Sequence, residues 1–228
     1  MSSKRFNNLS NNTKAIPAEV IEKLISTVKK NCTTKFEESI DLNLQINNKQ
    51  KKGEINLRTV VNLPAGSGKK IKVGVICDDS KIEEAKKANA DIFGSNDLIE
   101  KISSGKIEFE KLIATPDMMI KLSKVAKILG PKGLMPNPKL GTVTNDILKA
   151  VKDAKSGQVE IKNDKDGNIG TTIGKKSFSD TDLIKNYNSI IETILKDKPS
   201  NIKGEYIKNV FLTSTMGISY KLKINKSV

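Results

Sequence analysis

Catalytic and metal-binding side chains are scarce in this sequence. It contains no histidine, the commonest general base and a frequent zinc ligand. Its two cysteines, Cys32 and Cys77, are far apart, so they form neither a metal-ligand pair nor a redox motif. No candidate nucleophile has a visible activating partner. The sequence therefore predicts a protein that is not an enzyme and that has no catalytic residue, no metal site and no cofactor.

Two Gly-Lys pairs resemble the end of a phosphate-binding loop, namely Gly68-Lys69 and Gly174-Lys175. Such a loop requires a second glycine five positions before the glycine of the pair. Leu63 and Ile169 stand at those positions instead. These motifs therefore do not support a nucleotide-binding enzyme, the function that an α/β region in the middle of the chain would suggest.

The charge of the chain points to a polyanionic partner. Forty Lys and Arg face 26 Asp and Glu, which gives a net charge of +14. A surplus of this size is typical of nucleic-acid binding, although genome base composition is an alternative source of part of the lysine excess. A membrane surface is disfavoured because no long apolar run or basic amphipathic terminus is present. The first residues lack the apolar region of a signal peptide, so we expect a protein that is not secreted.

The segment 129–143 is rich in proline and glycine without being polar like a linker. A loop of this composition is expected to be rigid and shaped. Within it, Gly130-Pro131-Lys132-Gly133 matches the GxxG backbone clamp of one RNA-binding module, although the proline inside the motif argues against that fold. The alternative interpretation is a structural turn packed by Leu134 and Met135.

Two further segments place polar groups beside predicted strands. In the segment 34–39, the Phe36 ring can stack on a base or sugar while the Lys35 ammonium contacts phosphate. The alternative for Phe36 is a side chain that plugs the core. In the segment 213–217, the hydroxyl groups and the glycine would let RNA approach the backbone closely. The alternative for this segment is an ordinary hairpin turn.

The two ends of the chain share one pattern. A 3.6-residue apolar stripe from Val20 to Val28 predicts a helix. Period-2 alternation over 40–46 and 55–63 then predicts an antiparallel pair of strands with one exposed face. The same alternation returns towards the C-terminus, together with a hairpin turn and one apolar helix face: strands from 159 to 173 around the turn at 164–168, a helix over 183–195, and strands over 207–212 and 218–224.

The middle of the chain alternates short apolar strands with helices, which is typical of a small α/β domain. One helix of this region is expected to open with Thr115 as a hydroxyl cap and Pro116 at the first position, and to close at Gly130. Flexible joints near 64–69 and 156–158 separate this region from the ends. We therefore expect a discontinuous α+β domain from residues 1–67 and 158–228, with an inserted α/β domain over 68–157 and a hinge at the joint.

The run LGPKGLMPNPKLGTV resembles the signature of the large ribosomal subunit protein one family, in its bacterial or organellar form. The segments KFEES, LPAGSGK, DIFG, ATPDMM, KNDKDG, GKKSF and TSTMG follow in the order and spacing of that family. The resemblance covers nearly the whole chain. It implies an antiparallel α+β RNA-binding domain built from both termini, with an inserted three-layer α/β domain of Rossmann-like topology.

The resemblance also implies a function. A member of this family is a monomer within the large ribosomal subunit, binds large-subunit ribosomal RNA at the mobile side stalk, and assists release of deacylated tRNA from the exit site. Bacterial members also repress translation of their own messenger RNA. The expected location is the bacterial cytoplasm or an organellar matrix. The rival class of function is a regulatory RNA-binding protein that acts outside the ribosome.

By motif position, the resemblance transfers RNA contacts to three segments and to one isolated arginine. Ser39 stands where the family is expected to have threonine, and both hydroxyls can serve. The transferred RNA-binding residues are Lys35, Phe36, Ser39, Arg58, Lys175, Ser177, Thr215, Met216 and Gly217.

Overall fold

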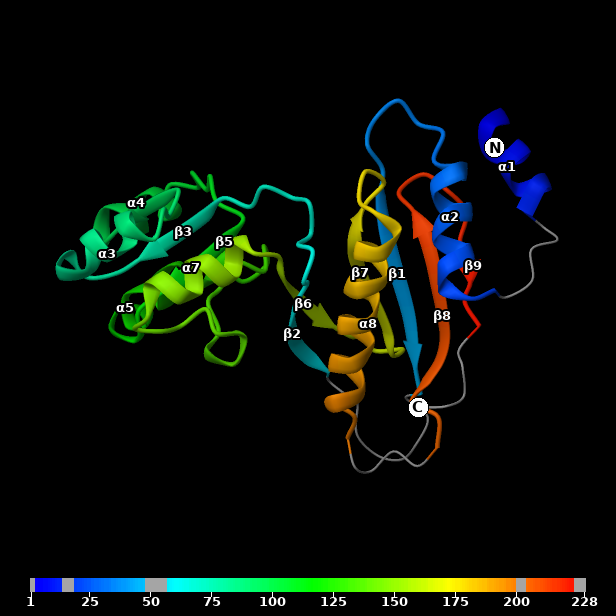
Figure 1. Ribbon diagram of the computed structural model, residues 1–228. Helices are drawn as coiled ribbons and strands as arrows, with labels where there is room; N and C mark the ends of the chain where they lie inside the picture. Colours follow the sequence, from blue (N-terminus) through cyan, green and yellow to red (C-terminus); the bar gives the residue numbers. More distant parts are fainter. Residues whose placement is uncertain (1–2, 14–18, 48–56, 200–203, 224–228) are drawn as a thin grey trace. The chain divides into compact units, whose positions relative to one another are not determined.

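The computed structural model describes residues 3–13, 19–47, 57–199 and 204–223. The chain forms two compact units, one from residues 1–68 and 159–228 and the other from residues 69–158. Helices and sheets occur in both units (Figure 1), which confirms the predicted mixture of α and β structure.

The terminal unit, residues 1–68 and 159–228, is built on an antiparallel sheet of four strands in the order β7-β1-β8-β9. In β1, every second side chain is buried, from Ile40 to Ile46, and packs on the core that α2 and α8 share. The other face of the sheet carries the polar residues of the alternation. The elements are α1 Lys4–Thr13, α2 Ile21–Asn31, β1 Ser39–Ile46, β7 Asn168–Lys175, α8 Asp180–Lys196, β8 Ile207–Ser214 and β9 Tyr220–Lys221.

Helix α8 begins at a well-formed cap and fastens the chain next to the joint. The Ser179 hydroxyl accepts the Asp182 N–H at 3.1 Å, which satisfies one of the free donors of the first turn. On its inner face, the buried Asn186 amide donates to the carbonyls of Gly66 and Ile173 at 3.0 and 2.7 Å and accepts the Ala65 N–H at 3.0 Å. Asn186 therefore anchors the segment that precedes the inserted unit.

The predicted pairing of 40–46 with 55–63 is wrong. Strand β1 lies between β7 and β8, while β2, Arg58–Asn62, pairs with β6, Gln158–Lys162, in a separate two-stranded sheet. Alternation specifies which face of a strand is buried but leaves its partner open. The ends of two predicted strands, at Ile55 and Ile224, lie outside the described residues.

The predicted hairpin around 164–168 forms only in part. Asp164 closes the turn, with its carboxylate accepting the N–H groups of Asp166 and Asn168 at 3.0 and 2.6 Å. However, β6 and β7 leave this turn for different sheets, and a single bridge between Asn163 and Ile169 joins them.

The inserted unit, residues 69–158, contains a parallel three-stranded sheet in the order β4-β3-β5. Alternate residues of β3 enter two different apolar clusters, because helices cover both faces of the sheet. One cluster includes residues of α4, α5 and α6, and the other includes residues of α3 and α7. The elements are β3 Val73–Ile76, α3 Ile82–Lys87, β4 Ile92–Gly94, α4 Asn96–Ser103, β5 Lys111–Ala114, α5 Pro116–Leu122, α6 Ala126–Leu129 and α7 Ile147–Lys155.

The helix predicted from Thr115 to Gly130 is interrupted, and its hydroxyl cap is wrong. A 3-10 turn at Ser123–Val125 separates α5 from α6. The Thr115 side chain makes no capping bond, and its hydroxyl is buried without a hydrogen-bond partner among the residues that the structure describes. Pro116 does occupy the first turn, where its missing N–H costs nothing.

We predict that the terminal unit folds without the inserted one. Residues 1–66 and 158–228, joined by a short linker, should unfold in one cooperative transition, because their apolar core is continuous through α2, α8 and the four-stranded sheet. Urea unfolding followed by circular dichroism measures this. A gradual, non-cooperative loss of signal would contradict the prediction.

Candidate nucleic-acid interface

Three segments that are distant in the sequence meet at one end of the four-stranded sheet. Strand β1 begins at this end, whereas its neighbours β7 and β8 finish there (Figure 1). The register pairs Ser39 with Lys175, and Ile40 with Ser214. We call this region the sheet-end site. It brings together eight of the sequence-predicted residues: Lys35, Phe36, Ser39, Lys175, Ser177, Thr215, Met216 and Gly217.

The ninth candidate, Arg58, is not part of this group. It is the first residue of β2, in the separate two-stranded sheet. Its guanidinium Nε forms an ion pair with Glu160 Oε1 at 2.6 Å. Arg58 therefore contacts a neighbouring strand of the two-stranded sheet and does not reach the sheet-end site.

Two large side chains project from the sheet-end site into solvent. Phe36 is 53% exposed and Met216 is 51% exposed. The alternative interpretation of Phe36 as a core plug is therefore wrong. Exposed apolar groups beside lysines suit a surface that contacts the apolar faces of bases or sugars.

Glu38 is the buried centre of the sheet-end site. Its carboxylate accepts the Thr34 hydroxyl at 2.9 Å, the Thr34 N–H at 3.3 Å and the Met216 N–H at 3.2 Å. Burial raises the pKa of Glu38, but the hydrogen bonds from Ser214, Thr34 and Met216 outweigh it, so the pKa lies below its usual value. One carboxylate thus ties the loop before β1 to the loop after β8.

Glu37, the neighbouring acid, points the other way. Its carboxylate contacts Lys175 Nζ at 2.9 Å and accepts a hydrogen bond from the Ser177 hydroxyl. These two contacts hold the pKa of Glu37 below its usual value. Glu37 is exposed, so it positions the Lys175 ammonium and the Ser177 hydroxyl at the surface rather than in the core.

Thr215 fastens the third segment to the start of β1. Its hydroxyl accepts the Ser39 N–H at 3.0 Å and lies 3.3 Å from the Ser39 carbonyl, to which it can donate. The Thr215 N–H donates to the same carbonyl at 3.1 Å. A hydroxyl oxygen has a second lone pair, so Thr215 can still accept a hydrogen bond from a ligand.

Gly217 is required by a close contact. A side-chain Cβ at this position would lie 2.3 Å from the Ser214 hydroxyl oxygen, which is far inside van der Waals contact. Ser214 is buried and donates to Glu38. The absence of a side chain at Gly217 therefore protects the Glu38 network.

The roles of Glu38 and Arg5 were not predicted from the sequence. The alternation of β1 could have indicated that Glu38 is buried, because it lies two residues before the buried Ile40 and four before the buried Leu42. No signal in the sequence indicated the role of Arg5. Arg5, on α1, donates to the Thr33 hydroxyl at 2.9 Å and to the Met216 carbonyl at 2.5 Å, which adds a cation to the site.

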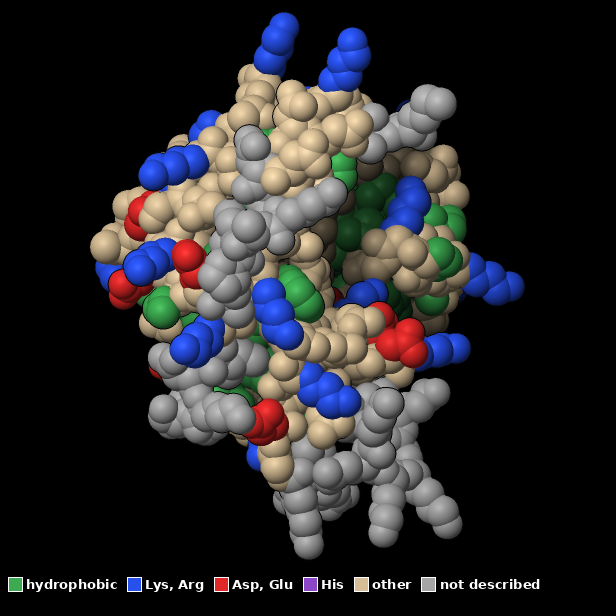
Figure 2. All heavy atoms as spheres, turned by 90° about the vertical axis from the view of Figure 1, so that its right-hand side faces the viewer, with side chains coloured by type: hydrophobic (Ala, Val, Ile, Leu, Met, Phe, Trp, Pro, Cys, Tyr) green, Lys and Arg blue, Asp and Glu red, His purple; other side chains and the backbone are tan. Residues whose placement is uncertain are grey.

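The surface around these residues is basic. On the face drawn in Figure 2, Lys and Arg side chains project across much of the surface, with a smaller share of Asp and Glu side chains among them. Near the sheet-end site, Lys176 Nζ donates to the Cys32 carbonyl at 2.8 Å, and Lys29 pairs with Asp180. Such a field attracts a polyanion.

In the inserted unit, the Pro- and Gly-rich segment forms a packed turn. Leu134 and Met135 pack against the apolar cluster of that unit, as the structural-turn interpretation predicts. The buried Thr142 hydroxyl accepts the Asn137 N–H at 2.8 Å and donates to the Asn137 carbonyl at 3.1 Å. Gly141 has a φ of +70°, the left-handed conformation that glycine adopts without strain.

Comparison with known proteins decides the family. The model of the ribosomal protein L1p/L10e family matches residues 28–218. The chain belongs to this family. It is 63% identical over 229 residues to the large ribosomal subunit protein uL1 of Pelagibacter ubique, and the match covers all of both chains. It is also 52% identical over 190 residues to uL1 of Rickettsia akari, covering 83% of this chain and 80% of that protein.

Membership of the L1 family confirms the prediction of a structural protein rather than an enzyme, because these relatives are ribosomal proteins. Over residues 3–13, 19–47, 57–199 and 204–223, no group of three or more Cys, Asp or Glu side chains could hold a metal ion. No helix within those ranges is long and apolar enough to cross a membrane.

Proposed function

We propose that this L1 family protein is a structural component of the large ribosomal subunit and binds ribosomal RNA through the sheet-end site. The full-length 63% identity to a uL1 protein supports the proposal that this protein is part of the large ribosomal subunit. The main support for this binding surface is that Lys35, Lys175 and Thr215 come together where three strands meet. A net charge of +14 supports a polyanionic partner.

The side chains of this surface would contact different parts of the RNA. Lys35 and Lys175 supply affinity through phosphates. Ser39, Ser177 and Thr215 offer hydroxyls to 2′-hydroxyl and base-edge partners. Phe36 and Met216 cover the apolar faces of bases or sugars. Because Glu38 holds the loops in place before RNA arrives, the surface is preorganised.

We further propose the place and the consequences of this binding. The RNA partner is the side stalk of the large subunit, and the protein assists the departure of deacylated tRNA from the exit site. A similar RNA fold in its own messenger RNA would compete for the same surface, which would repress its translation. The protein would accordingly reside with ribosomes in the cytoplasm.

Two measurements test the proposed function. In sucrose gradients at moderate salt, the protein should sediment with large subunits. Ultraviolet cross-linking to total RNA, followed by sequencing, should return one folded region of large-subunit ribosomal RNA. Sedimentation apart from ribosomes, with cross-links only to messenger or small RNAs, would support a regulatory RNA-binding protein instead.

Removing a lysine of the sheet-end site should weaken all RNA binding and reduce its salt dependence. For Lys35→Ala or Lys175→Ala, the slope of log affinity against log salt should fall by about one unit or less per charge. The measurement is filter binding of a stalk RNA fragment and a scrambled RNA at several salt concentrations. Lys196→Ala, at the other end of α8, is the charge-matched control. An equal effect of Lys196→Ala would show that RNA binding does not depend on the lysines of the sheet-end site in particular.

Removing the Thr215 hydroxyl should reduce recognition rather than overall affinity. Thr215→Val keeps the shape of the side chain but removes the acceptor of the Ser39 N–H and of an RNA donor, which costs about 1–3 kcal/mol of specific binding. Binding to scrambled RNA should be unchanged. Thr215→Ser should bind the stalk RNA fragment as the wild type does, because serine keeps the hydroxyl. Equal weakening of both RNAs, or of neither, would show that Thr215 is not part of the contact surface.

A further inference from the structure

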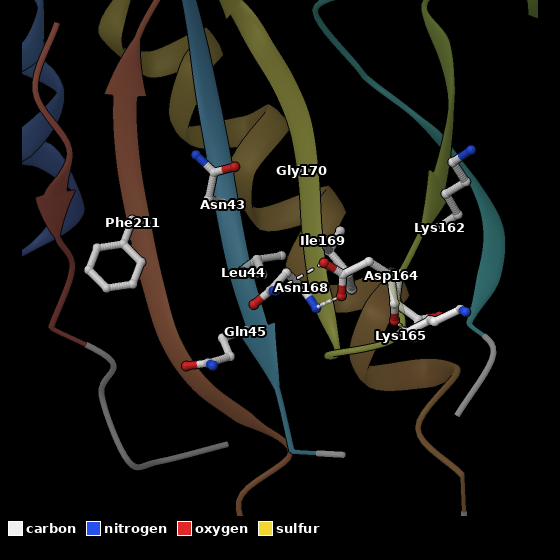
Figure 3. A pocket seen from close by; sticks show the side chains of 11 residues that line it. Asn43, Leu44, Gln45, Lys162, Asp164, Lys165, Asn168, Ile169, Gly170 and Phe211 are labelled. Atoms are coloured by element: carbon white, nitrogen blue, oxygen red, sulfur yellow. Dashed lines mark hydrogen bonds between the residues drawn. The ribbon is translucent and has the colours of Figure 1, made fainter. Parts of the chain in front are cut away.

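The exposed face of the four-stranded sheet carries a hollow, at the end opposite the sheet-end site. It has a volume of about 860 Å³ and lies over β1, β7 and β8, beside the turn at 164–168. Helices α2 and α8 pack against the other face, and within the described residues no helix covers this one. Figure 3 shows the Phe211 ring and the side chains of Asn43 and Gln45 on this exposed face.

Four of the eleven residues that line this hollow carry amides, and Phe211 supplies the aromatic ring. The register places Phe211 between Asn43 of β1 and Lys221 of β9. Gln45 and Asn209 are paired one step further along the same face. Phe211 is half-buried and Asn43 is exposed. A single ring among amides is a poor surface for apolar protein docking, which favours several apolar anchors.

Three amide side chains on this face, those of Asn43, Gln45 and Asn209, keep hydrogen-bonding capacity for a ligand. Gln45 Oε1 accepts the Asn209 amide at 2.8 Å, which leaves the Gln45 NH₂ group and the Asn209 carbonyl to bond outward. Across the described part of the chain, the Asn43 side chain has no hydrogen-bond partner. Opposite it, a Cβ at Gly170 would lie 3.3 Å from Asn43 Oδ1, so glycine keeps the floor of the hollow open.

The charge at the rim favours an anion. Lys162 and Lys165 line the hollow, and Lys221 flanks Phe211. Asp164 is the acid of the lining, but its carboxylate already accepts two backbone N–H groups and the Asn168 amide. An aromatic platform, free amides and a cationic rim together match an unpaired nucleotide: a base that stacks, base edges that hydrogen-bond, and a phosphate.

We propose that this exposed face binds an unpaired nucleotide of RNA, with the base stacked on Phe211 and its edge bonded to Asn43 and Gln45. The site is separate from the sheet-end site and adds a second RNA contact. It relies on the proposed function only for the class of polymer that the protein meets. Lys162 and Lys221 would lie on either side of the stacked base and contact its phosphates.

The test uses the full chain and a fluorescently labelled single-stranded RNA hexamer without secondary structure. Phe211→Leu keeps an apolar side chain but removes the ring, so affinity for the hexamer should fall about tenfold or more. Gly170→Val fills the floor of the hollow and leaves the Phe211 ring in place. It should lower the affinity for the hexamer to a similar extent. Unfolding midpoints equal to the wild type would show that both variants are folded.

A competition experiment separates this proposal from the proposed function. A saturating folded stalk RNA fragment, which occupies the sheet-end site, should not displace the hexamer. If Phe211→Leu and Gly170→Val bind the hexamer as the wild type does, the exposed face is not an RNA site. If the stalk RNA fragment displaces the hexamer instead, the single strand binds at the sheet-end site and this proposal is wrong, whereas the proposed function stands.

Discussion

Replacing Glu38 with Ala should lower the free energy of unfolding by about 2–4 kcal/mol, because it leaves buried donors without partners. The donors that lose their acceptor are the Thr34 hydroxyl and N–H and the Met216 N–H. Specific RNA affinity should fall at least about tenfold as well, because both loops lose their common anchor. Urea unfolding and filter binding measure the two effects.

The neighbouring acid provides a matched control for this prediction. Glu37 carries the same carboxylate one residue earlier but is exposed and contacts Lys175. Glu37→Ala should leave stability nearly unchanged and should not weaken binding to scrambled RNA, since it removes a negative charge from the surface. Equal losses of stability from the two substitutions would show that Glu38 is not the structural centre of the site.

The contribution of Glu38 should also depend on pH. Its pKa is lowered in the folded protein, so its carboxylate stabilises the fold above the unfolded pKa of about 4.3. This stabilisation is lost as the pH falls through the lower folded pKa. The difference in unfolding free energy between the wild type and Glu38→Gln should therefore be largest at neutral pH and should shrink below about pH 4. A constant difference would mean that the charge of Glu38 does not contribute.

Gly217→Val should have the second large effect, a loss of about 3 kcal/mol in specific RNA binding, or more than one hundredfold. Its Cβ would collide with the Ser214 hydroxyl, which is 2.3 Å from the position that Cβ must take. The side chain would also occupy space through which RNA approaches the backbone. Filter binding with the stalk RNA fragment and a scrambled RNA measures the loss, which should be small for the scrambled RNA.

A double variant distinguishes the two causes of this loss. Ser214→Ala removes the hydroxyl that the introduced valine would strike, so combining it with Gly217→Val should recover part of the folding stability. Specific RNA affinity should stay low in the double variant, because the valine still blocks the approach. Full recovery of affinity would show that Gly217 acts only through the fold and does not face the RNA.

The sequence by itself determined the class of protein and much of its local structure. A missing histidine, two distant cysteines and incomplete phosphate loops excluded the common enzyme chemistries. The long proline-glycine signature indicated the family, which the match over residues 28–218 confirms. Periodicity located the helix from Ile21, the strand from Ser39 and the helix from Asp180, because burying one face of an element leaves a regular apolar pattern in the chain.

Only the tertiary structure decided which strands are neighbours and which side chains form the sheet-end site. Period-2 alternation is the same whichever strand lies alongside, so it could not place β1 between β7 and β8 instead of beside β2. Glu38 reaches Met216 across 178 positions of sequence, and Ser39 reaches Thr215 across 176. Contacts over such separations depend on the register between distant strands, and that register is set by packing of the whole core rather than by any local preference of the residues involved.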